Sequence, residues 1–129
     1  MEQRLHLDAD LAAARVLRQA VIALCEQVQA DEAAIGDFAL AVSEAFSNAV
    51  RHGVGARQAF IEAQVEVNGE GARVCLRYPG EPFALDEPCL PAVDATGGRG
   101  RFLMSILTDQ VHYHFERGIT QATLTKQWR

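Results

Sequence analysis

The stretch from residue 58 to residue 78 alternates apolar and polar side chains around one short turn, Asn68-Gly69-Glu70-Gly71. Alternation with a period of two predicts strands that are buried on one face only, and the glycine-rich turn predicts that they pair as an antiparallel hairpin. The apolar positions are Ile61, Ala63, Val65 and Val67 before the turn, and Ala72, Val74, Leu76 and Tyr78 after it. A second layer of structure must cover this apolar face.

The first half of the chain predicts helices that can form this second layer. A first helix, capped by Asp8 or Asp10, runs to about residue 30, and a second runs from about residue 31 to Gly53, where a glycine suits a helix end. In the first helix apolar residues recur at spacings of four and three, at Leu17, Val21, Leu24 and Val28. In the second they are Ile35, Phe38, Val42, Ala45 and Ala49.

The remaining segments complete an α/β (α+β) two-layer sandwich. Its sheet is expected to be mixed and mostly antiparallel, with three helices on one face, and residues 1–129 form a single domain. Residues 79–97 contain four prolines and no clear period, which predicts a long loop. The other expected elements are an edge strand over 3–7, a third helix over about 99–108, and strands over 111–115 and 119–126.

Composition narrows the classes of partner. The net charge of −5 and the pI near 5.3 argue against nucleic acid and against an anionic membrane surface. The sequence has neither an apolar run of about 18 residues nor a charged-then-apolar leader. We therefore expect a cytoplasmic protein with protein partners and no membrane span.

Two segments point to a nucleotide site. Glu44, Asn48 and His52 stand four residues apart, so they follow one face of the second helix. About fifty residues later, three glycines surround Arg99 and lead directly into an apolar helix. Backbone N–H groups at such a helix start can receive phosphate. A carboxylate, an amide and an anion cradle together favour metal–phosphate chemistry.

The helix segment SEAFSNAVRHG resembles the N box of the GHKL superfamily of ATPases and kinases, and TGGRGRFLM followed by ERGITQATLTK resembles its later glycine boxes. Within that superfamily the chain is most similar to the anti-sigma-factor serine kinases of bacterial partner-switching systems. The resemblance runs from about residue 8 to residue 126. It implies the Bergerat-type ATP-binding fold, with ATP and Mg²⁺ as cofactors.

The resemblance also implies roles for individual residues. Glu44 is the expected general base, because a carboxylate can take the proton from an attacking hydroxyl, and Asn48 is the expected magnesium ligand. The other expected nucleotide-binding residues are His52, Gly80, Gly97, Gly98, Arg99, Gly100 and Thr120. Each has a plainer alternative: a solvated glutamate, a helix-end asparagine or histidine, flexible lid glycines, or an ordinary strand threonine.

One position departs from the family pattern. Members carry an Asp-x-Gly box whose Asp accepts a hydrogen bond from the exocyclic amine of adenine, and here the aligned residues are Tyr78, Pro79 and Gly80. Losing a hydrogen bond to a charged group weakens binding by about one to two orders of magnitude. The alternation places Tyr78 on the inward face of its strand, where it adds bulk to the adenine pocket.

These observations support two main functional hypotheses. The first is an ATP-dependent serine/threonine kinase that acts as a partner-switching regulator: it phosphorylates an anti-sigma-factor antagonist of the STAS type and sequesters a sigma factor or equivalent target. The second is a non-catalytic protein-binding module that has lost ATP through Tyr78. An ATP-hydrolysing module of a larger machine is a third alternative, and the resemblance leaves a homodimer open.

Two further groups of residues carry weaker signals. Cys25, Cys75 and Cys89 are odd in number and irregularly spaced, which predicts reduced thiols. His112 and His114 share one face of a strand, which suggests either a metal pair or, since no third ligand accompanies them, solvent-facing side chains. Arg101 is expected to face solvent or a partner.

Overall fold

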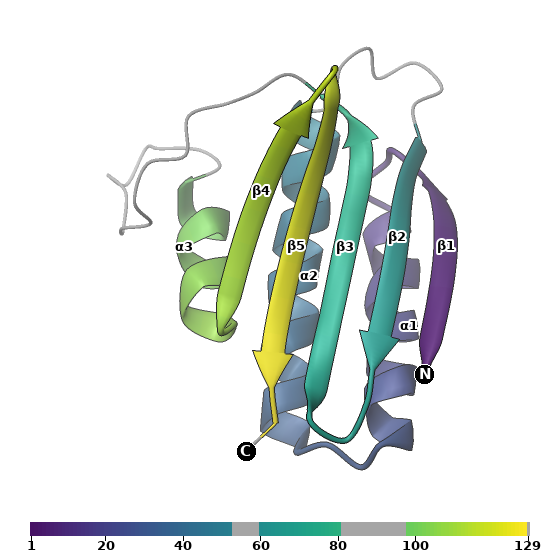
Figure 1. The fold of residues 1–129 in the computed structure, drawn as a ribbon, viewed down its shortest axis with the longest axis vertical. Helices are drawn as coiled ribbons and strands as arrows, with labels where there is room; N and C mark the ends of the chain where they lie inside the picture. The colour runs from purple at the N-terminus through teal and green to yellow at the C-terminus, as the bar shows by residue number, and fades with distance from the viewer. Residues whose placement is uncertain (53–59, 81–97, 129) are drawn as a thin grey trace.

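The computed structural model describes residues 1–52, 60–80 and 98–128, and within these ranges it contains five strands and three helices (Figure 1). The strands are β1 (Glu2–Asp8), β2 (Phe60–Val67), β3 (Gly71–Pro79), β4 (Gln110–Glu116) and β5 (Ile119–Gln127). The helices are α1 (Ala13–Gln27), α2 (Glu32–His52) and α3 (Gly98–Leu107).

The strands form one sheet in the order β1-β2-β3-β5-β4, and the helices form a single layer in which α2 packs against both α1 and α3. Figure 1 shows α1 and α2 behind the sheet and α3 beside the β4 edge, an arrangement that confirms the predicted two-layer sandwich. The sequence had suggested a mixed sheet, whereas the described strands pair antiparallel throughout. The helices α1 and α2 connect β1 to β2, which run in opposite directions. The strands β3 and β4 run in the same direction, but they do not pair because β5 lies between them.

Two tight turns fix the register of the hairpins. The Asn68 side-chain oxygen accepts hydrogen bonds from the backbone N–H groups of Glu70, at 2.7 Å, and of Gly71, at 3.0 Å. Arg117 and Gly118 both have positive φ, of 53° and 78°, as a two-residue type I′ turn requires. The first turn lies where the sequence predicted it, and the second joins the two strands predicted over 111–115 and 119–126.

The helix starts agree only in part with the prediction. Asp31 caps α2, because its carboxylate accepts the Ala34 N–H at 3.1 Å. The predicted cap of α1 at Asp8 or Asp10 is wrong: the N-cap is Ala12, without a side-chain cap. Asp10 instead accepts the Ala12 N–H at 2.8 Å, and so closes a turn ahead of the helix.

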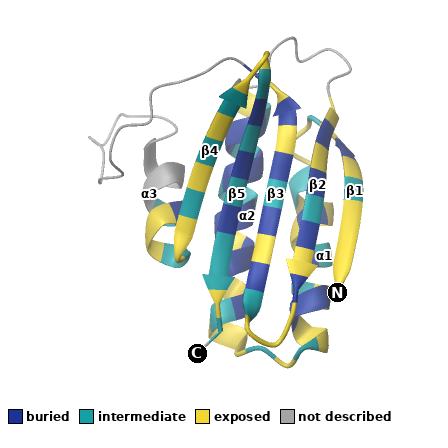
Figure 2. Cartoon of the chain, viewed as in Figure 1, coloured by how far each residue is buried: buried dark blue, intermediate teal, exposed yellow. Residues whose placement is uncertain are grey.

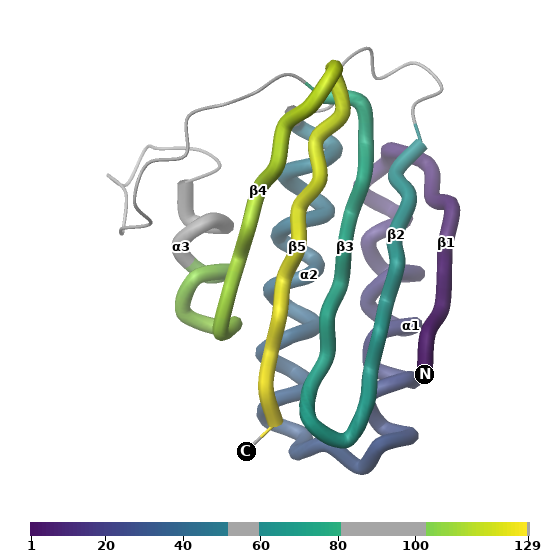
Figure 3. Tube along the Cα trace, in the orientation of Figure 1, coloured from purple at the N-terminus to yellow at the C-terminus, as the bar shows by residue number. Residues whose placement is uncertain are grey.

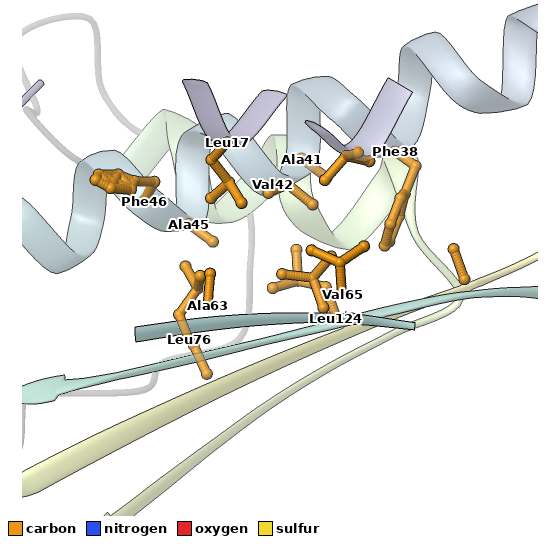
Figure 4. Close-up of a cluster of buried hydrophobic side chains, with 14 of the residues drawn as sticks. Leu17, Phe38, Ala41, Val42, Ala45, Phe46, Ala63, Val65, Leu76 and Leu124 are labelled. Carbon is orange, nitrogen blue, oxygen red and sulfur yellow. The ribbon is translucent and has the colours of Figure 1, made fainter. Parts of the chain in front are cut away.

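The hydrophobic core lies between the helices and the sheet. Burial alternates along β2 and β3, with the buried positions on the helix side, and Figure 2 shows the same alternation as bands of colour. Figure 4 shows side chains of α2 pointing toward those of the strands. The labelled members are Leu17, Phe38, Ala41, Val42, Ala45, Phe46, Ala63, Val65, Leu76 and Leu124.

The two ends of the sandwich differ in what they contain. Figure 3 shows both chain termini at the end that carries the β2–β3 turn. α2 and β3 finish, and β5 begins, at the opposite end, which we call the switch end. In the part of the chain that the model describes, no helix is long and apolar enough to cross a membrane.

Candidate functional site

The fold brings several predicted site residues to the switch end. Asn48 lies in the last turns of α2, Gly80 directly follows β3, and Thr120 is the second residue of β5. These three residues are distant in sequence. The antiparallel topology gathers them, because α2 and β3 finish at the same end at which β5 begins (Figure 1).

Glu44 and Asn48 occupy successive turns of α2 but differ in exposure. Glu44 is half-buried, whereas Asn48 is fully buried. Buried asparagine is uncommon in a core unless its amide is satisfied by hydrogen bonds. The two residues therefore combine a half-buried acidic residue and a buried amide on one stretch of helix.

The amide of Asn48 is only half satisfied. Its Oδ1 accepts a hydrogen bond of 2.5 Å from the guanidinium of Arg51, one turn further along α2. Its Nδ2 is buried and has no hydrogen-bond partner among the described residues. The guanidinium has only donors, so it fixes which end of the amide faces it.

Tyr78, Gly80 and Thr120 form a compact cluster on the helix side of the sheet. Tyr78 pairs with Thr120 across β3 and β5, and both side chains are buried. The hydroxyl of Thr120 donates to the Gly80 carbonyl at 3.3 Å. A Cβ on Gly80 would lie 3.2 Å from both the Tyr78 ring and the Thr120 hydroxyl, so only glycine allows this approach without a shift.

The phenol of Tyr78 is buried without a hydrogen bond to any described residue. Only 2% of the residue is exposed, and its hydroxyl has no hydrogen-bond partner among the described residues. Burial, with a smaller contribution from Tyr113, raises the pKa of the Tyr78 phenol, which therefore stays neutral. Tyrosine hydroxyls that are buried usually find a partner. The sequence prediction that Tyr78 faces inward is confirmed.

Other predicted site residues are described only in part or lie outside the described residues. His52 is the last residue of α2, and Gly98, Arg99 and Gly100 form the first turn of α3, so the predicted third helix is confirmed but starts within the glycine segment and not after it. The side chains of His52, Arg99 and Arg101 are not described. Gly97 and Cys89 lie outside the described residues.

The two histidines of β4 are not part of the candidate nucleotide site. His112 and His114 are exposed, and His114 lies 3.8 Å from the Glu116 carboxylate. Among the described residues no three His, Cys, Asp or Glu side chains gather as a metal centre would require. Cys25 and Cys75 are free thiols, as predicted.

Sequence reasoning missed Arg51. Residues three apart on a helix are neighbours, so the Asn48 and Arg51 spacing was a usable signal. Arg51 lies within the same motif, but the prediction used only the four-residue spacing of Glu44, Asn48 and His52. The missed contact matters because it engages the one atom of Asn48 that could bind a metal.

Comparison with protein families gives one match that covers most of the chain. The model of the histidine kinase-like ATPase domain matches residues 7–126. No match was found among curated proteins.

A solved structure shares the fold. The crystal structure of the RsbU and RsbW domains of Rv1364c from Mycobacterium tuberculosis superposes with a TM-score of 0.74 at 23% sequence identity. The match covers 99% of this chain and 32% of that chain, so this chain spans about a third of that one. At this identity the similarity establishes the fold alone.

Proposed function

The chain belongs to the histidine kinase-like ATPase family, and from this premise we propose that it is a partner-switching regulator that acts by binding a protein partner, without turning over ATP. The observation that carries this proposal is the burial of Tyr78 where the family resemblance places the adenine-binding Asp. The proposed partners are an anti-sigma-factor antagonist of the STAS type and a sigma factor or equivalent target. We propose the cytoplasm as its location.

The residues at the adenine end do not fit adenine. ATP is the ligand that the family implies, and the resemblance assigns its adenine to the region of Tyr78, Gly80 and Thr120. Here the Tyr78 ring packs against Gly80, and the Thr120 hydroxyl is engaged with the Gly80 carbonyl. At position 78 the carboxylate that would accept the exocyclic amine is replaced by a phenol, and its aromatic ring fills part of the space.

Protein binding does not need those atoms. The fold places α2, α3 and the sheet in the same arrangement as the RsbW-containing structure, and this arrangement is built from the hydrophobic core rather than from a ligand. A module that keeps this fold while filling its adenine site keeps the surfaces through which a partner can bind. This supports the binding role over the catalytic one.

The second candidate function is the ATP-dependent serine/threonine kinase. Glu44 favours it, because a half-buried carboxylate one turn before Asn48 is suitably placed to accept the proton of a substrate hydroxyl. This candidate requires two rearrangements: Tyr78 must leave the adenine end, and Asn48 must exchange Arg51 for Mg²⁺. The proposed binding role requires neither.

The test uses the purified chain and its cognate STAS-type antagonist. Binding is measured by isothermal titration in EDTA and again with Mg²⁺ and ATP, and the intact mass of the antagonist is recorded afterwards. We expect a complex in EDTA, an affinity that ATP changes by less than about twofold, and no gain of a phosphoryl group.

Phosphoryl transfer to the antagonist, abolished in a Glu44→Gln variant, would replace this proposal with the kinase. A complex that forms only with Mg²⁺ and ATP would also contradict it. If two folded proteins form no complex under either condition, the assignment of this partner is wrong.

A further inference from the structure

Asn48 is the residue that the family resemblance assigns to Mg²⁺, and the amide oxygen that a metal would bind is already occupied. A metal ion binds the carbonyl oxygen of an asparagine, never its NH₂ group. The Oδ1 atom accepts the Arg51 guanidinium at 2.5 Å, so the other end of the amide, Nδ2, is the buried end without a partner. The one atom of Asn48 that a cation would need is therefore already engaged by a positively charged group.

Charge reinforces this geometry. A guanidinium remains charged at every physiological pH, and it lies within one hydrogen bond of the only atom of Asn48 that could coordinate a metal. A divalent cation on the same oxygen would stand close to a positive charge in a partly buried site, where screening by water is reduced. No cluster of three acidic, histidine or cysteine side chains exists among the described residues to offset that repulsion.

The position of Arg51 is also favourable in itself. It is the penultimate residue of α2, where the helix dipole favours a cation. Its partner Asn48 precedes it by three residues, a spacing at which helical side chains meet. Arg51 thus has two reasons to remain in place that do not depend on any ligand.

We propose that Arg51 is the resident cation of this site and takes the place of Mg²⁺ at Asn48, so that the end of α2 keeps its arrangement without a divalent ion. This inference deepens the proposed function and rests on it for the absence of nucleotide. In this role Arg51 is a positioning residue, because it acts by holding the Asn48 amide.

The test uses Mn²⁺ as a paramagnetic probe, with the full chain labelled for NMR. Mn²⁺ broadens the backbone signals near its binding site, so titration reports where and how tightly it binds. We expect no saturable broadening around Asn48 in the parent chain. Arg51→Met, which keeps the length of the side chain but removes its charge, should bind Mn²⁺ there at least about tenfold more tightly.

Two control variants separate charge from shape and location. Arg51→Lys keeps a cation and should exclude Mn²⁺ as the parent does. Arg4→Met removes an arginine on β1, where it faces Glu2, and should leave the α2 signals unchanged. Saturable broadening around Asn48 in the parent, or equal Mn²⁺ binding by the parent and Arg51→Met, would overturn the inference.

Thermal unfolding gives a second readout that does not need a metal complex. The midpoint of the parent should be the same in EDTA and in Mg²⁺, and a rise with Mg²⁺ would also count against a resident Arg51. The two proposals fail separately. ATP binding by the parent without Mn²⁺ at Asn48 removes only the nucleotide-free function, and Mn²⁺ at Asn48 without ATP binding removes only the role of Arg51.

Discussion

The two halves of α2 bury different chemistry. From Ile35 to Phe46 the fully buried residues are all apolar and face the core beneath the sheet (Figure 4), although the Oγ of half-buried Ser43 also has no partner among the described residues. Beyond Phe46 the helix buries Asn48, whose Nδ2 has no partner. A buried polar atom without a hydrogen bond costs about 1–3 kcal/mol. Asn48 therefore carries a cost that an apolar side chain would avoid, and it lies at the end of α2 where the predicted site residues Gly80 and Thr120 gather.

Two aromatic side chains at opposite ends of the sandwich make the same contrast. Trp128, at the end that carries the termini, donates its indole N–H to the Asn68 carbonyl at 3.0 Å and meets Phe38 edge to face. Tyr78, at the switch end, is more deeply buried, and its hydroxyl lacks a partner among the described residues. Trp128 therefore satisfies its polar group, whereas Tyr78 buries a hydroxyl without a described partner.

Phe38→Ala tests the core side of the contrast with the largest expected effect. Phe38 is fully buried in the first half of α2, and removing its ring should cost about 3–5 kcal/mol of unfolding free energy through lost burial and a cavity. Urea denaturation measures this loss. Leu40→Ala on the exposed face of the same helix is the control and should change stability by less than about 1 kcal/mol. Equal effects of the two substitutions would break the contrast.

High pH should lower the free energy of unfolding through Cys25, a buried residue of α1 in the hydrophobic core. Burial, followed by the charge of Glu26, raises the pKa of this thiol from 9.0 to about 11. The folded state therefore holds its proton more tightly than the unfolded chain, and this stability is complete below pH 9 and lost as the pH rises toward 11. Between pH 8 and 10.5 the parent should lose about 2 kcal/mol more than Cys25→Ala. Parallel losses in urea denaturation at the two pH values would show that the thiol is not sequestered.

Tyr78→Phe tests whether the buried hydroxyl at the switch end is unsatisfied. It keeps the ring that fills the adenine end and removes a buried hydroxyl that has no described partner. Unlike most core substitutions, it should leave stability unchanged or raise it by about 1 kcal/mol. Urea denaturation measures the difference. A loss of more than about 1 kcal/mol would mean that the hydroxyl is satisfied in solution, and the contrast with Trp128 would not hold.

Gly36→Ala has the smallest expected effect and concerns the first half of α2. Glycine within a helix is less favourable than alanine, and a Cβ at this exposed position would meet no atom within 4 Å. The substitution should raise stability by about 0.5–1 kcal/mol, which urea denaturation can detect. A decrease would indicate that this half of α2 also holds a constraint beyond packing.

The sequence predicted the hydrophobic core and the elements around it better than the contacts at the switch end. Period-two alternation around Asn68 and helical spacing through Leu17 and Val42 predicted the hairpin and the helices, because burial follows hydrophobicity there. The α1 cap was misplaced, because Asp10 satisfies a backbone N–H within a turn ahead of the helix. The mixed sheet was not found, since strand order depends on long-range pairing that local patterns do not encode.

At the switch end the sequence predicted which residues gather but not how they interact. Asn48, Gly80 and Thr120 were singled out by motif, and the topology places them at one end of the fold. The three-residue spacing of Asn48 and Arg51 made their contact foreseeable, whereas the hydrogen bond of Thr120 to Gly80 depends on strand pairing that no spacing reveals. The assigned roles of Glu44, His52, Gly97, Gly98, Arg99 and Gly100 remain predictions.

Isothermal titration with ATP and with ADP in the presence of Mg²⁺, on the parent chain, Tyr78→Asp and Tyr78→Phe, tests the central claim most directly. The account predicts no detectable binding by the parent or by Tyr78→Phe at millimolar nucleotide. It predicts binding by a folded Tyr78→Asp variant that is at least about tenfold tighter, because an acceptor for the adenine amine is restored and the ring is gone. Micromolar binding of ATP by the parent chain would contradict the account and return the kinase to first place.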